Sequence, residues 1–166
     1  MLRRAVIDSS PLINLVHLDL APALDIYFDV VFVPRAVQSE VNKKSRFRYR
    51  LKKLYASGVF RPCAIADESS VRLLVSYAIH QGEAEALAQA QERGLNIFIG
   101  DEKRARAIGE NMGMKPLGTA RIIARMHLES FADEPRRLIR KLRKDLHFRI
   151  ADEVVDDAIE RAPEPI

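Results

Sequence analysis

The sequence predicts an α/β protein with a mostly parallel central sheet. Short apolar runs at residues 4–8, 29–34 and 95–101 have the length and composition of buried strands. Segments with the spacing of amphipathic helices separate these runs. Parallel neighbours need a crossover connection, so the alternation of strand and helix favours a parallel sheet.

The first two strands are each followed by a helix signal. Ser10 is the predicted N-cap of the first helix and Pro11 its first residue, because proline is tolerated where no N–H bond is needed. Pro34 suits a second helix start, and Val37 and Val41 lie four residues apart on its buried face. These signals predict two consecutive strand–helix units.

The middle of the chain is basic. Residues 43–62 hold eight Lys or Arg and no Asp or Glu. Residues 63–66 are a candidate short strand, and residues 69–79 a candidate helix. The Ala-rich segment 81–94 is a strong helix signal, acidic in its first turn and ending in glycine.

The last third continues the alternation and then becomes helical. After the strand at 95–101 the sequence predicts a helix over 102–113, a short strand at 115–117 and a helix over 118–128. Residues 133–161 favour two more helices, a basic one and then an acidic one. We therefore expect one domain over residues 1–130 and a helical extension over 131–166, packed on that domain or on a partner.

Composition narrows the class of protein. The 166 residues carry a formal net charge of +4, which permits a polyanionic partner. The single cysteine excludes an internal disulfide framework and agrees with a reducing compartment. No apolar run approaches the length of a membrane span, and no secretion signal is evident, so we expect a cytoplasmic protein without a membrane partner.

Two of the predicted strands end in an aspartate, Asp8 and Asp101. Ligands of open α/β sheets bind at the carboxyl ends of the strands, so both acids can face one crevice. Carboxylates held close together repel each other unless a proton or a cation lies between them, and Mg²⁺ or Mn²⁺ suits such oxygen ligands. Glu40 and Glu83 can join them, although each also fits a solvated helix position. For Asp8 the alternative is a capping role shared with Ser10.

Several segments together resemble the PIN-domain family of metal-dependent ribonucleases, closest to the branch related to VapC-type toxins. They span most of residues 4–128 and are VIDSSPLINL (6–15), VPRAVQSEV (33–41), GEAEALAQA (82–90), IGDEKRAR (99–106) and GTARII (118–123). The resemblance implies a three-layer α/β/α sandwich, here with extra C-terminal helices. It also implies a cleft of three or four acids that holds Mg²⁺ or Mn²⁺.

The family's acids map onto this sequence one by one. Asp8, Glu40, Glu83 and Asp101 match the first to fourth acid and would be the catalytic and metal-binding residues. Glu83 is preferred to Glu85 because small residues then fall where the family has them. Two departures are that Glu replaces the usual Asp at position 83, and that Glu102 follows Asp101 directly as a possible fifth ligand or a solvated helix start.

The resemblance implies an endoribonuclease, the toxin of a toxin–antitoxin pair, acting on RNA as a homodimer with a cognate antitoxin protein as partner. The alternative is a non-catalytic RNA- or protein-binding module with the same fold. Candidate substrate contacts are Ser10, Lys43, Lys44, Arg46, Arg48 and Thr119. Cations can grip phosphates, and the interleaved Phe47 and Tyr49 can stack on bases. The competing interpretation of this stretch is a solvated helix, and Ser10 and Thr119 can equally be N-caps.

Overall fold

A computed structural model describes residues 2–64 and 67–166. At its centre lies a parallel sheet with the strand order β3-β2-β1-β4-β5. The strands are β1 (Arg4–Ile7), β2 (Val30–Pro34), β3 (Phe60–Cys63), β4 (Ile97–Ile99) and β5 (Lys115–Leu117). The predicted α/β class is confirmed, and every strand pair among the described residues is parallel.

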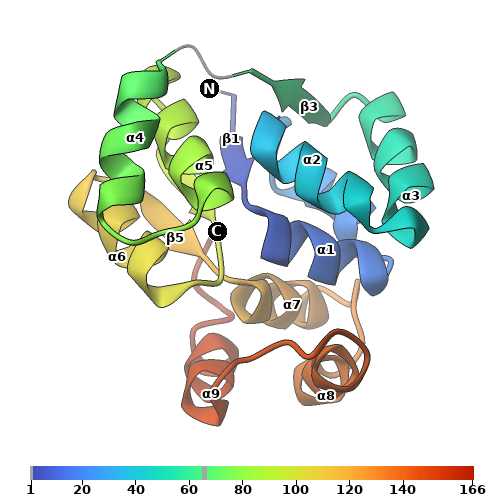
Figure 1. Cartoon of the computed structure of the whole chain (residues 1–166). Coiled ribbons are helices and arrows are strands. Elements are labelled where there is room, and N and C mark those ends of the chain that lie inside the picture. The colour runs from blue at the N-terminus through green and yellow to red at the C-terminus, as the bar shows by residue number, and fades with distance from the viewer. Residues whose placement is uncertain (1, 65–66) are drawn as a thin grey trace.

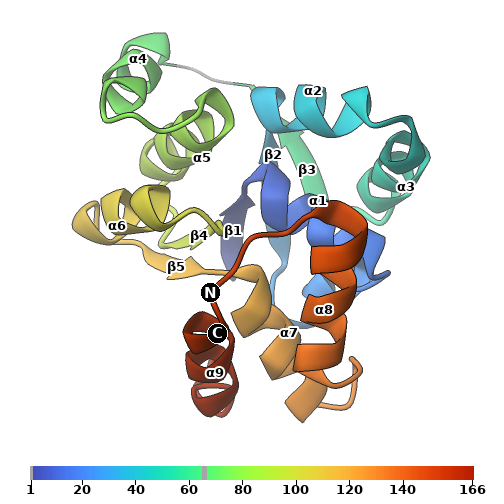
Figure 2. The same cartoon turned by 60° about the horizontal axis from the view of Figure 1, so that its bottom comes forward.

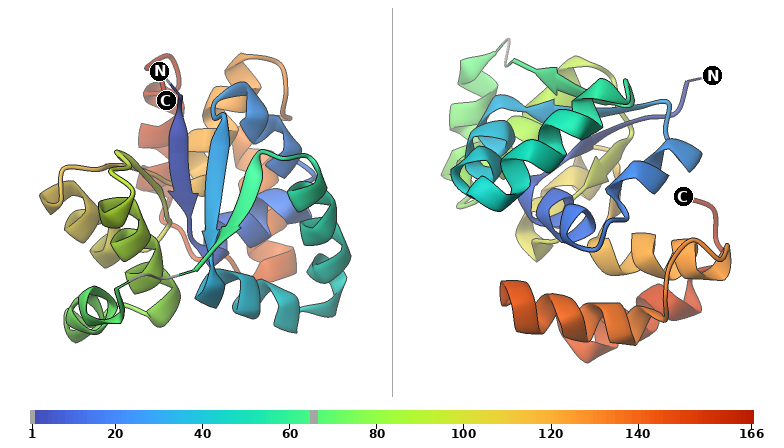
Figure 3. Two further views of the ribbon diagram at one scale, coloured as in Figure 1. Left: turned by 90° about the horizontal axis from the view of Figure 1, so that it is seen from above. Right: turned by 90° about the vertical axis from the view of Figure 1, so that its right-hand side faces the viewer.

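Helices cover both faces of this sheet (Figure 1). Helices α4 to α6 lie on one face, whereas α1, α3 and α7 lie on the other with the short 3-10 helix η1; α2 lies by the carboxyl ends of the strands (Figure 3). The bounds are α1 (Ser9–His17), η1 (Ala21–Ile26), α2 (Arg35–Lys43), α3 (Ser45–Ala56), α4 (Glu68–Ser76), α5 (Gln81–Glu92), α6 (Lys103–Asn111), α7 (Thr119–Leu128), α8 (Pro135–Leu146) and α9 (Asp152–Glu160).

The side chains of β1 point alternately into the two core clusters, one on each face of the sheet. Ala5 and Ile7 belong to the larger core cluster, with α1 and α7, while Val6 points to the opposite cluster beneath α5. A strand buried on both faces has no polar side, which explains why its sequence is a continuous apolar run. The polar residue that follows it, Asp8, therefore marks the edge of the sheet.

The two C-terminal helices form an outer layer against α7 (Figure 2). Ile139 and Leu142 of α8 and Val155 and Ala158 of α9 are buried members of the larger core cluster. Buried apolar side chains stabilise a fold in proportion to the surface removed from water. These helices therefore share a core with the sheet domain.

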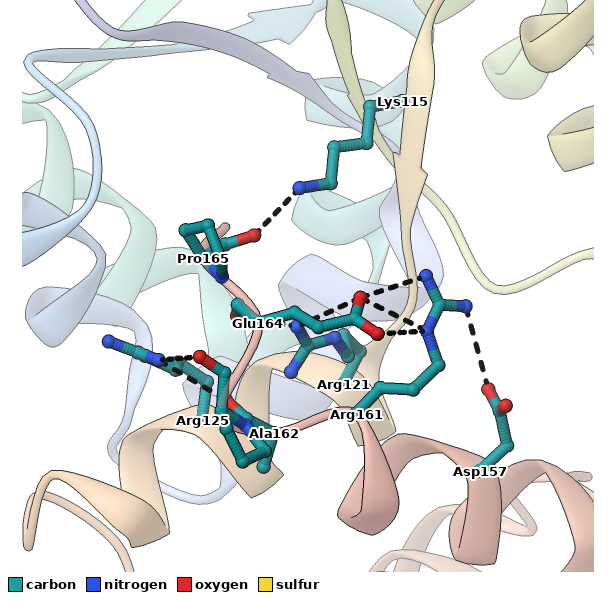
Figure 4. A network of polar contacts seen from close by, with 9 residues as sticks. Lys115, Arg121, Arg125, Asp157, Arg161, Ala162, Glu164 and Pro165 are labelled. Atoms are coloured by element: carbon teal, nitrogen blue, oxygen red, sulfur yellow. Dashed lines mark hydrogen bonds and ion pairs between the residues drawn. The ribbon is translucent and has the colours of Figure 1, made fainter.

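The segment after α9 is fastened to the sheet domain by cationic side chains (Figure 4). Arg121 donates to the carbonyl oxygen of Glu164 at 2.6 Å, and Arg125 donates to those of Ala162 and Pro163. Lys115 donates to the carbonyl oxygen of Pro165 at 2.7 Å. These bonds satisfy backbone oxygens that no helix or strand pairs.

Two local predictions were placed wrongly. The third strand begins at Phe60, inside the basic stretch, rather than at residue 63; residues 65 and 66 of the predicted strand lie outside the described part of the chain. The first helix begins at Ser9 with Asp8 as its N-cap residue, not at Pro11 after Ser10. Pro11 lies within the first turn, where its missing N–H costs nothing.

None of the helices in the described ranges combines the length and apolar character that a membrane span requires.

Candidate metal-binding and active site

An acidic cavity of about 360 Å³ lies at the carboxyl edge of the sheet. Its residues come from the ends of β1 and β4, from α1, α2 and α5, and from the segment between α8 and α9. All four predicted acids line it, and so does Glu102. The lining residues are Asp8, Ser10, Ile13, Asn14, Glu40, Lys44, Glu83, Asp101, Glu102, Leu146, His147, Phe148 and Arg149.

The sheet register brings the first two acids together. β1 and β4 are neighbours, with Ile7 paired to Ile99, and the backbone N–H of Asp8 donates to the carbonyl oxygen of Ile99 at 2.9 Å. Asp8 and Asp101 therefore follow adjacent strands on the same edge. This arrangement is the one that the strand-end argument predicts from sequence.

Asp8 is buried, with only 4% of its surface exposed, and its Oδ1 atom has no hydrogen-bond partner in the described structure. Burial raises the pKa of this carboxyl, the backbone hydrogen bond from Ser9 opposes the rise, and the carboxylates of Glu83, Glu40 and Asp101 add to it, so that the pKa lies at about 7. It occupies the N-cap position of α1 but makes no capping hydrogen bond with its side chain. The capping alternative for Asp8 therefore lacks its defining bond.

Asp101 is held by four hydrogen bonds. Thr119 donates its backbone N–H to Oδ1 and its hydroxyl to Oδ2, both at 2.7 Å. Ser10 and Asn14 donate to the same Oδ2 at 2.9 and 3.2 Å. Burial raises the pKa of Asp101, and the bonds from Thr119 and Ser10 oppose that rise. These contacts fix the orientation of the Asp101 carboxylate in the lining of the cavity.

The roles of Ser10 and Thr119 differ from simple N-caps. Gly118, not Thr119, is the N-cap residue of α7, and both hydroxyls point to Asp101 instead. Thr119 has no exposed surface, so it positions Asp101 and has no access to a substrate. Ser10 keeps part of its surface at the cavity.

Glu83 and Glu85 lie two residues apart on α5 and face different neighbours. Glu83 lines the cavity and accepts the N–H of His80 at 2.8 Å, as in a capping box. Burial raises its pKa, and the nearby carboxylates of Glu102 and Glu40 add to the effect. Glu85 instead accepts the N–H of Ala36 at the start of α2 at 2.7 Å. Glu83 is therefore the α5 acid available to the cavity.

The remaining two acids are exposed. Glu40 projects from α2, and Glu102 is the N-cap of α6, where it accepts the N–H of Ala105 at 2.8 Å. Gly82 makes room between the groups: a Cβ there would lie 3.2 Å from Asp8 Oδ1 and 3.9 Å from Glu40 Oε2. The absence of a side chain at position 82 lets α5 approach the acids closely.

The donor set fits a hard divalent cation. Its ligands would be carboxylate oxygens, which Mg²⁺ and Mn²⁺ prefer, and the unpaired Oδ1 of Asp8 is a buried acceptor aimed at no protein donor. Within residues 2–64 and 67–166, no three His, Cys, Asp or Glu side chains already stand in a metal-holding arrangement. The exposed carboxylates of Glu40 and Glu102 would have to turn toward Asp8 to complete such a site.

Sequence reasoning missed two parts of the site. Asn14 donates to Asp101 and also to the hydroxyl of Thr119 at 3.3 Å. Its signal was a polar residue on the face that α1 buries, one turn after Ser10. The segment Leu146–Arg149 also lines the cavity, and no local pattern in the sequence marks it.

The structure separates the basic stretch into members with different positions. Lys44 lines the cavity, whereas Lys43, Arg46 and Arg48 are exposed on α2 and α3 and do not line it. Phe47 is buried in the core and cannot stack on a base; the stacking prediction was wrong for this residue. Tyr49 is exposed and stays a candidate. The competing interpretation, a solvated helix with an apolar seam of Leu51, Leu54 and Tyr55, agrees with the structure at Leu51 and Leu54, while Tyr55 is only half-buried and Phe47 joins the buried face.

A parallel α/β fold with carboxylates gathered at the carboxyl edge of its sheet defines a class of proteins with an acidic cavity for a cation. Within that class, a family model described as PIN domain matches residues 4–164. The match spans nearly the whole described chain, and the chain belongs to the PIN-domain family. PIN domains are in general nucleases and typically depend on a divalent metal ion.

Other comparisons add little. No curated protein matches the chain. The chain is similar to one in a solved structure described as a toxin–antitoxin complex from Klebsiella pneumoniae. The identity is 22% and the TM-score 0.48, with 62% of this chain and 90% of that chain covered.

Proposed function

We propose that this PIN-domain protein is a metal-dependent endoribonuclease that hydrolyses RNA phosphodiesters. The observation that carries the proposal is the buried Asp8, whose Oδ1 lacks a partner in the described structure while three further predicted acids line the same cavity. Burying a carboxylate without a partner is costly, so a fold retains one where a cation or a reaction uses it.

Asp8, Glu83 and Asp101 would hold the metal ion, Mg²⁺ or Mn²⁺, with Glu40 as a further ligand. A bound divalent ion supplies Lewis-acid activation of water and neutralises charge on the scissile phosphate. The protein's part is to keep Asp101 fixed through Thr119, Ser10 and Asn14. As an alternative to binding the metal, Glu40, which is exposed, would orient the attacking water; hydrolysis forms the new phosphorus–oxygen bond as the bond to the leaving sugar oxygen breaks.

The positive residues near the cavity support a polyanionic substrate. Lys44 is inside the cavity lining, and Lys43, Arg46 and Arg48 continue from it along the end of α2 and the start of α3. Cations at such a mouth lower the repulsion that a phosphate backbone meets from five carboxylates. Arg48 is partly committed, because its guanidinium donates to the carbonyl oxygen of Asn42.

Cleavage assays test the proposal directly. The wild-type protein is incubated with single-stranded RNA, and with DNA of the same sequence, in Mg²⁺, Mn²⁺ or EDTA. We expect metal-dependent cleavage of RNA that falls at least about 100-fold in Asp8→Asn, because a principal ligand is lost. Asp25→Asn, an exposed aspartate outside the cavity, is the matched control and should cleave normally.

A second readout does not depend on activity. Mn²⁺ titration followed by thermal unfolding should stabilise the wild type and Asp25→Asn, but not Asp8→Asn. RNA binding without cleavage in any metal, unchanged in Asp8→Asn, would instead identify a non-catalytic binding module.

We propose the toxin role and the homodimer from the family resemblance alone. A toxin role requires a cognate antitoxin protein that blocks cleavage, and a homodimer requires self-association of the chain. Both are measurable once cleavage is established.

A further inference from the structure

One wall of the acidic cavity is formed by the end of α8 and the segment that follows it, and not by residues at the strand ends. Four consecutive residues line it together with the acids: Leu146 at the end of α8, and His147, Phe148 and Arg149 after it. Ser10, Ile13 and Asn14 of α1 line the cavity between the two sides. α2 and α3 lie on one side of α1 and α8 on the other (Figure 3). The cavity is thus bounded by parts of the chain about 100 residues apart in the sequence.

This wall is anchored to the core. His147 takes the left-handed conformation with a φ of 55°, which ends α8 and turns the chain. Phe148 and Ile150 then pack against the larger core cluster, and Arg143 donates to the carbonyl oxygen of Ile150 at 2.8 Å. The residue between these two apolar anchors, Arg149, is therefore presented from a fixed stretch of backbone.

A second contact ties the end of α8 to the helix between the walls. His17 of α1 lies 2.8 Å from the carboxylate of Asp145, which Lys141 also contacts at 2.7 Å. The end of α8 is thus held beside α1 just before it enters the cavity lining at Leu146.

Arg149 is the cation of this wall, as Lys44 is on the α2 side. Both are exposed and line the cavity, and in the described part of the chain neither side chain forms an ion pair or a hydrogen bond. A guanidinium matches the geometry of a phosphate through paired N–H donors. Two uncommitted cations that flank five carboxylates fit an anion that is repeated along a strand better than one compact anion.

We propose that Arg149 and Lys44 bind backbone phosphates of one single RNA strand on either side of the acids. This places the intervening phosphodiester over the carboxylates. The inference rests on the proposed nuclease function and adds the path of the substrate, with the α8–α9 segment as part of the substrate site.

The test measures binding and cleavage separately. A fluorescent single-stranded RNA is titrated in Mg²⁺ with Asp8→Asn protein, which binds without cutting, at several salt concentrations. Adding Arg149→Gln should weaken binding severalfold and lower the slope of log affinity against log salt by about 0.7, the value of one phosphate contact on a single strand. Adding Lys44→Gln should lower it by a similar amount again.

Matched variants separate charge from structure. Arg149→Lys keeps the charge and should retain most of the affinity and the salt slope. Arg140→Gln removes an exposed arginine of α8 that does not line the cavity and should bind as its parent does. In the otherwise wild-type protein, Arg149→Gln should raise KM more than it lowers kcat, with an unchanged melting temperature.

The two proposals can fail independently of each other. Normal cleavage by the wild type, with Arg149→Gln indistinguishable from Arg140→Gln in affinity, salt slope and KM, would overturn the inference and leave the nuclease function standing. No RNA cleavage by the wild type in any metal would overturn the proposed function and the inference with it.

Discussion

Asp8 and Asp101 end two neighbouring parallel strands, yet their carboxylates lie in opposite surroundings. Asp101 accepts four hydrogen bonds from three residues, whereas Oδ1 of Asp8 meets no donor in the described structure. Asp8 is buried and Asp101 is half-buried, and burial raises the pKa of each. Equal positions at the edge of a sheet thus do not give equal chemistry; the donors on the surrounding helices decide it.

Because their hydrogen bonding differs, we expect Asp8 and Asp101 to have distinct roles. A carboxylate with its lone pairs already occupied is held rigidly and keeps the shape of the site. A buried carboxylate with a free oxygen gains most from a cation. We therefore expect Asp101 to matter for folding as well as for activity, and Asp8 chiefly for metal binding and activity.

The largest expected effect on stability comes from Asp101→Asn. The new amide group would set a donor against the donors of Thr119 or of Ser10 and Asn14, and a buried unsatisfied donor costs about 1–3 kcal/mol. With more than one donor affected, we expect a loss of about 3 kcal/mol in the free energy of unfolding, measured by urea titration without metal. Asp8→Asn is the comparison and should be neutral or stabilising; equal losses in both would contradict these distinct roles.

The next effect is on pH dependence. The raised pKa of Asp8, about 7 in the folded protein against about 3.8 when exposed, means that the folded state holds a proton that the unfolded state releases. The stabilisation is full below about pH 4 and is lost as pH rises toward 7. Between pH 5 and 8 the metal-free protein should therefore lose about 3 kcal/mol of stability, since about two pH units of this range lie below the pKa and one pKa unit is about 1.4 kcal/mol.

Two controls sharpen this pH experiment. Asp8→Asn should flatten the profile between pH 5 and 8, and Mg²⁺ should stabilise the wild type more at pH 8 than at pH 5. A wild-type profile that is already flat, like the one expected for Asp8→Asn, would show that Asp8 is ionised without a metal.

The smallest expected effect comes from Gly82→Ala. The added Cβ would lie 3.2 Å from Oδ1 of Asp8, which is tighter than ordinary contact, so the carboxylate must shift by a few tenths of an ångström. Alanine also favours the helix by up to about 1 kcal/mol. We expect a severalfold weaker affinity for Mn²⁺, measured by calorimetry, without loss of stability. Unchanged affinity would mean that Asp8 adjusts freely and that its free oxygen is not confined.

Local patterns in the sequence were sufficient to predict the site residues that lie at the ends of strands. A buried strand is apolar on both faces, so an acid directly after it, as at Asp8, or two residues after it, as at Asp101, is visible without a structure. The choice of Glu83 over Glu85 came from the family resemblance; helical geometry shows only that residues two apart point to different sides. The sheet class follows from the same periodicity.

Local patterns were less informative about where each helix or strand begins and about which residues of a charged run are exposed. The basic stretch contains both a helix with a buried seam and the start of β3, because hydrophobic burial at Phe47 and Phe60 outweighs the positive residues around them. The aromatic residues within a charged run can face either way, and only packing decides which.

The sequence by itself determined the parallel α/β class, the acids at the strand ends and the membership that its motifs indicate. Tertiary structure alone decided that Asn14 and Thr119 hold Asp101, and that Arg149 shares a cavity with Asp8. The physical reason is range: strand and helix periodicity acts over a few residues, whereas these contacts join groups about 20 to 140 positions apart and arise only when particular helix faces pack on the sheet.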